Sequence, residues 1–207
     1  MQAKLLFLPL TAVGGTAAAL YARHRVSLDV DFVTPYLKER FSDVEAALET
    51  MPDFEPLRIR RPVLILGRVG EDEVGIRQLR RDAPLDVIER EGLCLPTLPE
   101  MIRIKAFLLS DRRAVRDFVD LAALLETAGM TAALQALVSF DNLYSGLTKA
   151  GALVAFAEAT HDEPVDADLV DVKDWRFLRP EYQDMNRVRQ LCQELAMGAL
   201  ENAGRAD

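Results

Sequence analysis

The chain has 207 residues, of which half are hydrophobic and 28% are charged, a balance typical of a globular protein. Its formal net charge of −8 argues against a broadly basic nucleic-acid binder but is compatible with a local basic groove. The two cysteines lie far apart in the sequence and cannot form a zinc site alone, and with only two histidines the set of possible zinc ligands is poor. No stretch has the ~18 uncharged apolar residues of a membrane helix, and we predict a cytoplasmic protein with free thiols and no membrane contact.

A glycine turn followed by a short helix is the first predicted feature. Gly14, Gly15 and Thr16 precede an alanine-rich run long enough for two to three helical turns at ~3.6 residues per turn. Glycines let the backbone approach a phosphate closely, and Thr16 can cap a helix whose N-terminus offers free N–H groups to an anion. We therefore predict a phosphate-binding turn. Residues 1–20 also have the apolar pattern of a signal peptide, an alternative that the glycine motif in the same stretch disfavours.

Two aspartates follow in a predicted strand, where Asp29 and Asp31 alternate with the apolar Val30 and Phe32. Successive side chains of a strand point to opposite faces, so the two carboxylates share one face and the apolar pair points to a core. Adjacent carboxylates repel each other, and a hard cation such as Mg²⁺ or Mn²⁺ relieves that repulsion. The pattern predicts a metal site suited to phosphoryl or nucleotidyl transfer. Either motif alone also occurs by chance.

The two motifs in this order resemble the AbiEii/AbiGii-type nucleotidyltransferase toxin family, within the DNA polymerase β-like nucleotidyltransferase superfamily. That family carries Gly-Gly-Thr, a helix and then His/Arg-Arg-x-Ser-x-Asp-x-Asp-Phe, and this chain has the same order from Gly14 to Phe32. The resemblance implies that Asp29 and Asp31 hold the metal and act in catalysis. It also implies a set of residues that bind the nucleoside triphosphate: Gly14, Gly15, Thr16, Arg25 and Ser27.

The next stretch predicts a mixed α/β core. Pro35 opens a predicted helix over residues 34–50, residues 57–67 predict one or two strands bent at Pro62, and residues 70–73 predict a hairpin turn. A partner strand is expected from Val74 to Leu79. Six arginines of this region either line a local acceptor groove or form an ordinary solvated face: Arg58, Arg60, Arg61, Arg77, Arg80 and Arg81.

The predicted partner strand also departs from the superfamily pattern. The superfamily places a third carboxylate on a later strand beside the first pair, whereas this strand carries Arg77 and Gln78. The third metal ligand is therefore either absent or replaced by another acid, and the sequence leaves both alternatives open.

Residues 97–129 predict two helices. Thr97 and Glu100 have the spacing of a capping box, Asp111 is expected to cap the second helix, and Gly129 is expected to end it. Lys105 lies in an apolar run and needs a phosphate or a carboxylate partner. The four-residue spacing also predicts solvated ion pairs on a helix face, each stabilising by about a few tenths of a kcal/mol: Arg113 with Asp117 and Arg116 with Asp120.

The same region continues the family resemblance, because the family has a Lys-x-x-Ala/Leu-Leu helix, an Arg and then Arg/Lys-Asp-x-x-Asp-Leu. This chain has Lys105 to Leu109, Arg113 and Arg116 to Leu121. The resemblance implies that Lys105 contacts nucleotide phosphates, that Asp117 supports the active site and that Arg116 helps to bind the nucleotide.

The remaining sequence carries little chemistry. One or two helices are predicted over residues 130–160 and a final helix over residues 181–203. Asp166 and Asp168 repeat the Asp-x-Asp pattern, but without a phosphate loop nearby we expect a solvated loop. Trp175 and its neighbour Phe177 are candidates for base stacking, although an isolated Trp is more often a core or interface anchor.

Together these observations predict an α+β fold, with a nucleotidyltransferase-like mixed sheet and flanking helices followed by a helical C-terminal region. We expect the α/β core in residues 1–96 and the helical region in residues 97–207. The predicted function is metal-dependent transfer of a nucleotide from a nucleoside triphosphate to an RNA, with tRNA as candidate, or to a protein. The resemblance suggests the toxin of a toxin–antitoxin or phage-defence pair, with an antitoxin as partner. The alternative is a catalytically weakened module that binds nucleotide or a partner.

Overall fold

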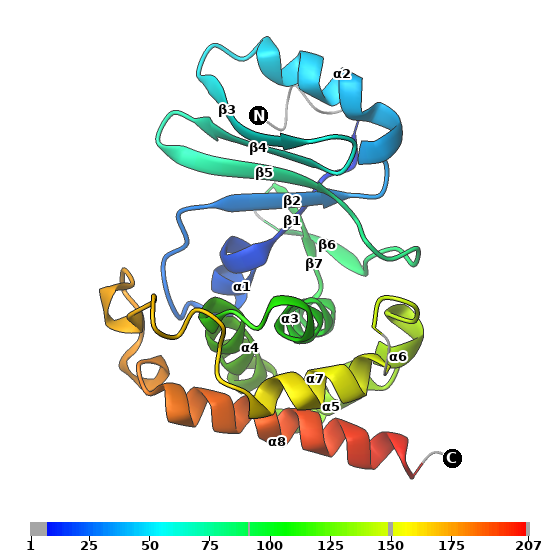
Figure 1. Ribbon diagram of the computed structural model, residues 1–207, viewed down its shortest axis with the longest axis vertical. Helices are drawn as coiled ribbons and strands as arrows, with labels where there is room; N and C mark the ends of the chain where they lie inside the picture. The colour runs from blue at the N-terminus through cyan, green and yellow to red at the C-terminus, as the bar shows by residue number, and fades with distance from the viewer. Residues whose placement is uncertain (1–7, 91, 149–150, 206–207) are drawn as a thin grey trace. The chain divides into compact units, whose positions relative to one another are not determined.

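A computed structural model describes residues 8–90, 92–148 and 151–205 (Figure 1). The first part of the chain contains all the strands of the described residues together with two helices: β1 Thr11–Val13, α1 Gly14–Ala22, β2 Val30–Thr34, α2 Leu37–Glu49, β3 Phe54–Arg60, β4 Leu64–Val69, β5 Asp72–Gln78, β6 Val87–Arg90 and β7 Leu93–Pro96. The second part is helical: α3 Leu98–Arg112, α4 Val115–Ala128, α5 Met130–Leu137, α6 Phe140–Leu143, α7 Ala152–His161, the short 3₁₀ helices Val172–Asp174 and Pro180–Tyr182, and α8 Met185–Ala203.

The chain forms two units, which are described separately. The sheet unit comprises residues 8–17 and 27–96, and the helical unit comprises residues 18–26 and 97–205. The mixed sheet with its flanking helices and the helical C-terminal region confirm the predicted α+β fold class. The proposed division into domains 1–96 and 97–207 stays a prediction, and in the structure residues 18–26 group with the helical unit.

The sheet unit contains a five-stranded sheet in the order β1-β2-β5-β4-β3. β2 and β5 run parallel, and the other neighbouring strands run antiparallel. Alternation along the strands buries Phe32 and Ile76 while Asp31 stays on the opposite face, as the sequence pattern predicts. α2 adds an apolar face: Leu37, Phe41, Val44 and Leu48. The predicted helix over residues 34–50 and the break at Pro62 are confirmed. The predicted hairpin turn is present before β5 but is shorter than residues 70–73, because β5 begins at Asp72.

In the helical unit, the sequence correctly predicted where α3 begins and where α4 ends, but not how α4 begins. Thr97 caps α3 by accepting the N–H of Glu100 (3.4 Å), and Gly129, at φ +79°, ends α4, both as expected. The prediction that Asp111 caps the second helix is wrong, because α3 continues to Arg112. The N–H of Val115 at the start of α4 instead donates to Asp166 Oδ1 (2.8 Å), so Asp166 does not belong to a purely solvated loop.

The rest of the helical unit packs around these two helices. The described residues between 130 and 160 contain three helices rather than one or two, and α8 lies along α7 and α5 (Figure 1). Asp184 begins α8 by accepting the N–H groups of Asn186 and Arg187. Cys94 and Cys192 are free thiols, as predicted. Among the described residues, no helix combines the length and apolar character needed to span a bilayer. Residues 1–7, the start of the stretch with the signal-peptide alternative, lie outside the described residues.

Candidate active site

Of the two predicted metal ligands, Asp29 and Asp31, Asp31 is the more closely enclosed. It lies on β2 opposite Val13 of β1 and Gly75 of β5. Gly14 has φ +77°, and a Cβ on it would lie 3.2 Å from Asp31 Oδ2. A Cβ on Gly75 would lie 2.3 Å from Asp31 Oδ1, closer than real Cβ contacts allow. The carboxylate therefore occupies a space between two glycines at the N-terminus of α1, where backbone N–H groups favour negative charge.

Asp29 lies one residue before β2, so the prediction that it belongs to the strand is off by one position. Its side chain is exposed, and its backbone carbonyl accepts hydrogen bonds from the hydroxyls of Thr16 and, at 3.4 Å, Ser27. Thr16 is the third residue of α1, so it does not cap the helix as predicted. The structure thus brings Gly14, Thr16, Ser27 and both aspartates into one site of the sheet unit, with Gly15 as second residue of α1. Their roles in binding nucleotide and metal stay predictions.

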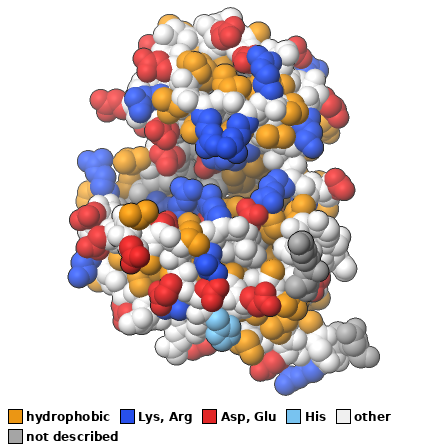
Figure 2. Space-filling view, in the orientation of Figure 1, with side chains coloured by type: hydrophobic (Ala, Val, Ile, Leu, Met, Phe, Trp, Pro, Cys, Tyr) orange, Lys and Arg blue, Asp and Glu red, His pale blue; other side chains and the backbone are white. Residues whose placement is uncertain are grey.

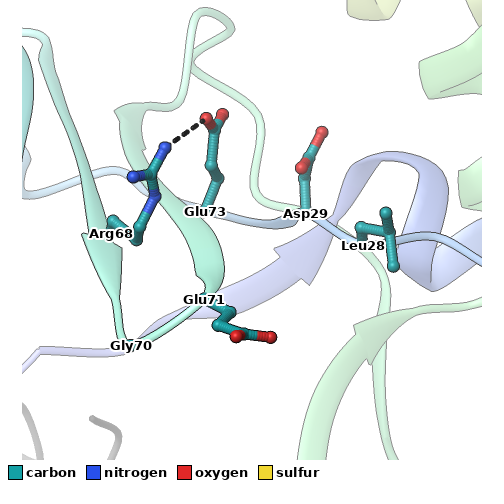
Figure 3. Close-up of a pocket in the computed structure, with 6 residues that line it drawn as sticks. All are labelled: Leu28, Asp29, Arg68, Gly70, Glu71 and Glu73. Carbon is teal, nitrogen blue, oxygen red and sulfur yellow. Dashed lines mark ion pairs between the residues drawn. The ribbon is translucent and has the colours of Figure 1, made fainter.

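A pocket of about 400 Å³ opens beside Asp29. Figure 3 shows the Asp29 and Glu73 side chains at its edge, with an ion pair between Glu73 and Arg68 (3.7 Å). Glu73 belongs to β5, on the same face as Gly75 and Arg77, whereas sequence reasoning placed it in the hairpin turn. The alternation Glu-x-Gly-x-Arg in residues 73–77 was the signal that would have identified it. An acid therefore does lie on this strand, two residues before the position opposite Asp31.

Arg77, not an acid, is the side chain of β5 that contacts Asp31. Its Nε donates to Asp31 Oδ1 at 3.1 Å, and both side chains are partly exposed. The strand thus supplies a cation where the superfamily pattern places a third carboxylate.

The donor set decides whether a divalent cation fits this site. Among residues 8–90, 92–148 and 151–205, no group of three His, Cys, Asp or Glu side chains lies close enough to hold a metal ion. Mg²⁺, however, is commonly held by one or two carboxylates together with waters and substrate phosphates. Asp29 and Asp31 fit that second arrangement, in which the nucleotide completes the coordination.

The other predicted catalytic residues, Lys105 and Asp117, lie in the helical unit. Lys105 is 1% exposed, and its ammonium contacts Asp117 Oδ1 (3.1 Å) and Asp120 Oδ2 (2.7 Å). Arg112 also donates to both oxygens of Asp117, from Nε (2.6 Å) and Nη2 (2.9 Å). Buried lysines need such partners, and of the two kinds of partner expected for Lys105, a phosphate or a carboxylate, the structure shows carboxylates. Its contact with nucleotide phosphates stays a prediction.

Asp120 joins the first residues of the helical unit to α4. His24 Nε2 lies 2.8 Å from Asp120 Oδ1, and Arg25 donates from Nε to the same oxygen (2.9 Å) and from Nη2 to Oδ2 (3.2 Å). Burial alone would raise the pKa of Asp120, but the charge of Lys105, the hydrogen bond from His24 and the charge of Arg25 outweigh it and hold that pKa well below its usual range. Asp120 is therefore ionised at neutral pH.

Asp117 is held in its ionised form in the same way. Burial would raise its pKa, whereas the charge of Lys105 and the hydrogen bond and charge of Arg112 lower it below the ordinary aspartate value. Two residues that were predicted to bind the nucleotide also lie in this unit. Arg25 pairs with Asp120, and Arg116 is exposed on α4.

The predicted helix-face ion pairs are wrong. Arg113 pairs with Asp162 rather than with Asp117, because Arg113 is the left-handed C-cap of α3 at φ +47° and does not share a helix with Asp117. Asp120 is buried and pairs with His24, Arg25 and Lys105, whereas Arg116 is exposed to solvent.

The arginines of the sheet unit do not act as one group. Arg58 and Arg60 are exposed, Arg61 pairs with Glu45, and buried Arg81 donates to the carbonyls of Ala83 and Pro84. Together with the Arg77–Asp31 contact, this argues against one groove lined by all six. Figure 2 shows basic and acidic side chains both present across the visible face of the molecule.

The two candidate stacking residues differ in their surroundings. Trp175 is half-buried, and the guanidinium carbon of Arg25 lies 5.2 Å from its ring centroid. Phe177 is 82% exposed at φ +56°. Trp175 therefore packs against Arg25, which pairs with Asp120.

Solved structures of other proteins share this fold. JHP933 from Helicobacter pylori matches with a TM-score of 0.52 at 18% identity, over 98% of this chain and 88% of that protein. An H. pylori protein assigned as a nucleotidyltransferase matches with a TM-score of 0.51 at 17% identity, over 99% and 92%. The antibiotic-resistance factor ANT(2'')-Ia matches with a TM-score of 0.51 at 16% identity, over 70% and 88%. The chain therefore has the nucleotidyltransferase fold.

No protein-family model and no curated protein sequence matches the chain. At 16–18% identity, the structural matches establish the fold alone. The resemblance to the AbiEii/AbiGii-type family stays a prediction.

Proposed function

We propose that this protein transfers a nucleotidyl group from a nucleoside triphosphate to an acceptor hydroxyl, which loses its proton and displaces pyrophosphate from the α-phosphate, with a divalent cation as cofactor. The observation that carries the proposal is the enclosure of the Asp31 carboxylate between Gly14 and Gly75 at the start of α1, within a nucleotidyltransferase fold. A carboxylate and a set of free helix N–H groups side by side are what a metal–triphosphate complex requires.

Within the proposed site, the chain's residues position and neutralise the triphosphate. The N–H groups at Gly14, Gly15 and Thr16 bind phosphate oxygens, while Asp29 and Asp31 hold the cation against the same phosphates. A bound Mg²⁺ supplies positive charge that offsets the charge developing on the phosphates. The hydroxyls of Thr16 and Ser27 fix the backbone at Asp29 through its carbonyl. Positioning of this kind accounts for most of the catalysis in phosphoryl transfer.

We propose a supporting role for the buried group in the helical unit. The ammonium of Lys105 is already shared by Asp117 and Asp120, and breaking a buried pair leaves an uncompensated charge. In this role, the ion pair between Lys105 and Asp117 holds α3 against α4, and neither side chain contacts the phosphates directly.

The acceptor and biological setting follow from the family resemblance. We propose a toxin of a toxin–antitoxin or phage-defence pair, with tRNA as the first acceptor to test and a protein as the second. ANT(2'')-Ia has been solved with adenylyl-2''-tobramycin, so a hydroxylated amine is the third acceptor to test. The charged side chains that line the pocket are three acids, Asp29, Glu71 and Glu73, and one base, Arg68, and this excess of negative charge suits a cationic acceptor of that kind.

A second candidate function is nucleotide binding without turnover. It is favoured by the contact of Arg77 with Asp31 and by the lack of a three-acid group among the described residues.

The test is transfer of α-³²P-labelled nucleoside triphosphates, with Mg²⁺, into total tRNA, total protein or tobramycin. Wild type is compared with Asp29→Asn and Asp31→Asn, and with Asp43→Asn, which removes an exposed carboxylate of α2. Circular dichroism checks that each variant is folded. Label that appears with wild type and Asp43→Asn and is lost in both site variants supports nucleotidyl transfer and identifies the acceptor class. Metal-dependent triphosphate binding without any transfer to these acceptors would favour the binding module.

A further inference from the structure

The contact between Arg77 and Asp31 has a direct consequence for metal binding. Arg77 extends from β5 on the face that it shares with Gly75, and its Nε–H reaches Asp31 Oδ1 at 3.1 Å. The missing side chain at Gly75 leaves the space in which this oxygen lies. One oxygen of Asp31, a predicted metal ligand, is therefore already paired with the permanently charged guanidinium of Arg77.

A divalent cation and the guanidinium compete for this oxygen. A cation bound at Oδ1 would lie beside Arg77, and like charges repel over such short distances. The other described residues do not compensate, since no three acidic, histidine or cysteine side chains form a metal-binding group. Without a bound nucleotide, the site is therefore expected to bind a divalent cation weakly.

A triphosphate changes this balance. Its oxygens complete the coordination of a divalent cation, and they also offer the guanidinium a multiply charged, bidentate partner. The Arg77 side chain is 43% exposed, so it is free to turn from the carboxylate to an incoming anion. Exposed ion pairs are weak, so little opposes the exchange.

We propose that Arg77 competes with a divalent cation for Asp31 until a triphosphate enters, when the guanidinium moves to the phosphates and leaves the carboxylate to the metal. This inference rests on the proposed function and assigns to Arg77 the role of a positioning residue that couples metal binding to triphosphate binding.

The first test measures Mn²⁺ binding to the nucleotide-free, full-length protein from the electron paramagnetic resonance signal of free Mn²⁺. Arg77→Gln should bind Mn²⁺ about two- to fivefold more tightly than wild type, the range expected when an exposed ion pair is removed. Arg77→Lys keeps the charge and should lie between the two. Arg58→Gln removes an exposed arginine from β3, an edge strand that β4 separates from β5, and should match wild type. Equal Mn²⁺ affinity in Arg77→Gln and Arg58→Gln would overturn the inference.

The second test measures binding of inorganic tripolyphosphate without metal, by isothermal titration calorimetry. Arg77→Gln should bind it at least fivefold more weakly than Arg58→Gln, and unchanged affinity would contradict the proposed exchange. These readouts are independent of turnover. If labelled transfer fails but Arg77→Gln gains Mn²⁺ affinity and loses tripolyphosphate affinity, the inference stands and the proposed reaction falls. If transfer occurs and Arg77→Gln matches Arg58→Gln in both assays, the inference alone falls.

Discussion

Asp31 and Gly75 lie directly opposite each other in the parallel pair of β2 and β5, and a Cβ at Gly75 would lie 2.3 Å from Asp31 Oδ1. The carboxylate therefore keeps its position only because residue 75 has no side chain. The same oxygen accepts the Arg77 hydrogen bond, so one glycine determines both where Asp31 points and what it contacts.

Gly75→Ala should impair the site more than the fold. The added methyl would displace the short Asp31 side chain, and a misplacement of about 1 Å can lower activity about 100-fold. Overpacking of this kind typically costs about 1–3 kcal/mol of unfolding free energy. We expect the lower end, because a side-chain terminus rather than backbone has to move.

Urea denaturation of Gly75→Ala, Asp31→Ala and the double variant measures that cost. If the methyl clashes with Asp31, the double variant is less destabilised than the sum of the single changes. Strict additivity would show that the methyl group meets some other part of the sheet.

Lys105→Met should unfold more readily than wild type. It leaves Asp117 and Asp120 buried with one cation fewer, and breaking a buried pair typically costs about 3–5 kcal/mol. The measurement is urea denaturation, with Lys38→Met as the control because Lys38 is exposed on α2 and its loss should change stability by less than about 0.5 kcal/mol.

Kinetics of the same variants distinguish the structural role of Lys105 from the predicted phosphate contact. A stable Lys105→Met protein whose triphosphate affinity is greatly reduced would contradict the structural role. Reduced stability with near-normal activity in the remaining folded protein would support it.

Stability should decrease in acid because of Asp117 and Asp120. Their pKa values are below the ordinary aspartate value in the folded state, so the unfolded chain takes up more protons as the pH falls. Their contribution is complete above the unfolded aspartate pKa and is lost progressively below about pH 5. The charged side chains that face them are Arg25, Lys105 and Arg112, and the His24 ring contacts Asp120 as well.

Urea midpoints measured from pH 7 to pH 3 test this dependence. Asp120→Asn should be less stable than wild type at pH 7 and should lose less further stability on acidification, whereas Asp43→Asn should follow wild type. A pH dependence in Asp120→Asn as steep as in wild type would assign the acid sensitivity to other carboxylates.

The features that sequence reasoning predicted correctly are mostly local. The Thr97 cap, the Gly129 stop and the strands on either side of Pro62 depend on residues a few positions apart, and their geometry follows from backbone preferences. The alternation of Asp31 with Phe32 likewise needed only the period of a strand.

The features that it missed depend on residues far apart in the chain. Asp120 is separated by 95 positions from Arg25, and no helical spacing relates the two. The predicted pairing of Arg113 with Asp117 failed because the chain leaves the helix at Arg113, so the four-residue rule does not apply across the break. Glu73 was missed because the hairpin turn is shorter than predicted, which moved this residue onto β5.

The Asp-x-Asp pattern at residues 166–168 gives a matched pair for a last prediction. Asp166 Oδ1 accepts the N–H of Val115 at the start of α4, whereas Asp168 is exposed. A carboxylate that caps a helix typically contributes about 0.5–2 kcal/mol, so Asp166→Ala should lower the unfolding free energy by about 1 kcal/mol and Asp168→Ala by less than about 0.5 kcal/mol. Urea denaturation at pH 7 measures both. Because each change removes one carboxylate from the same loop, their effect on net charge is identical, and equal destabilisation would show that the cap at Val115 contributes nothing.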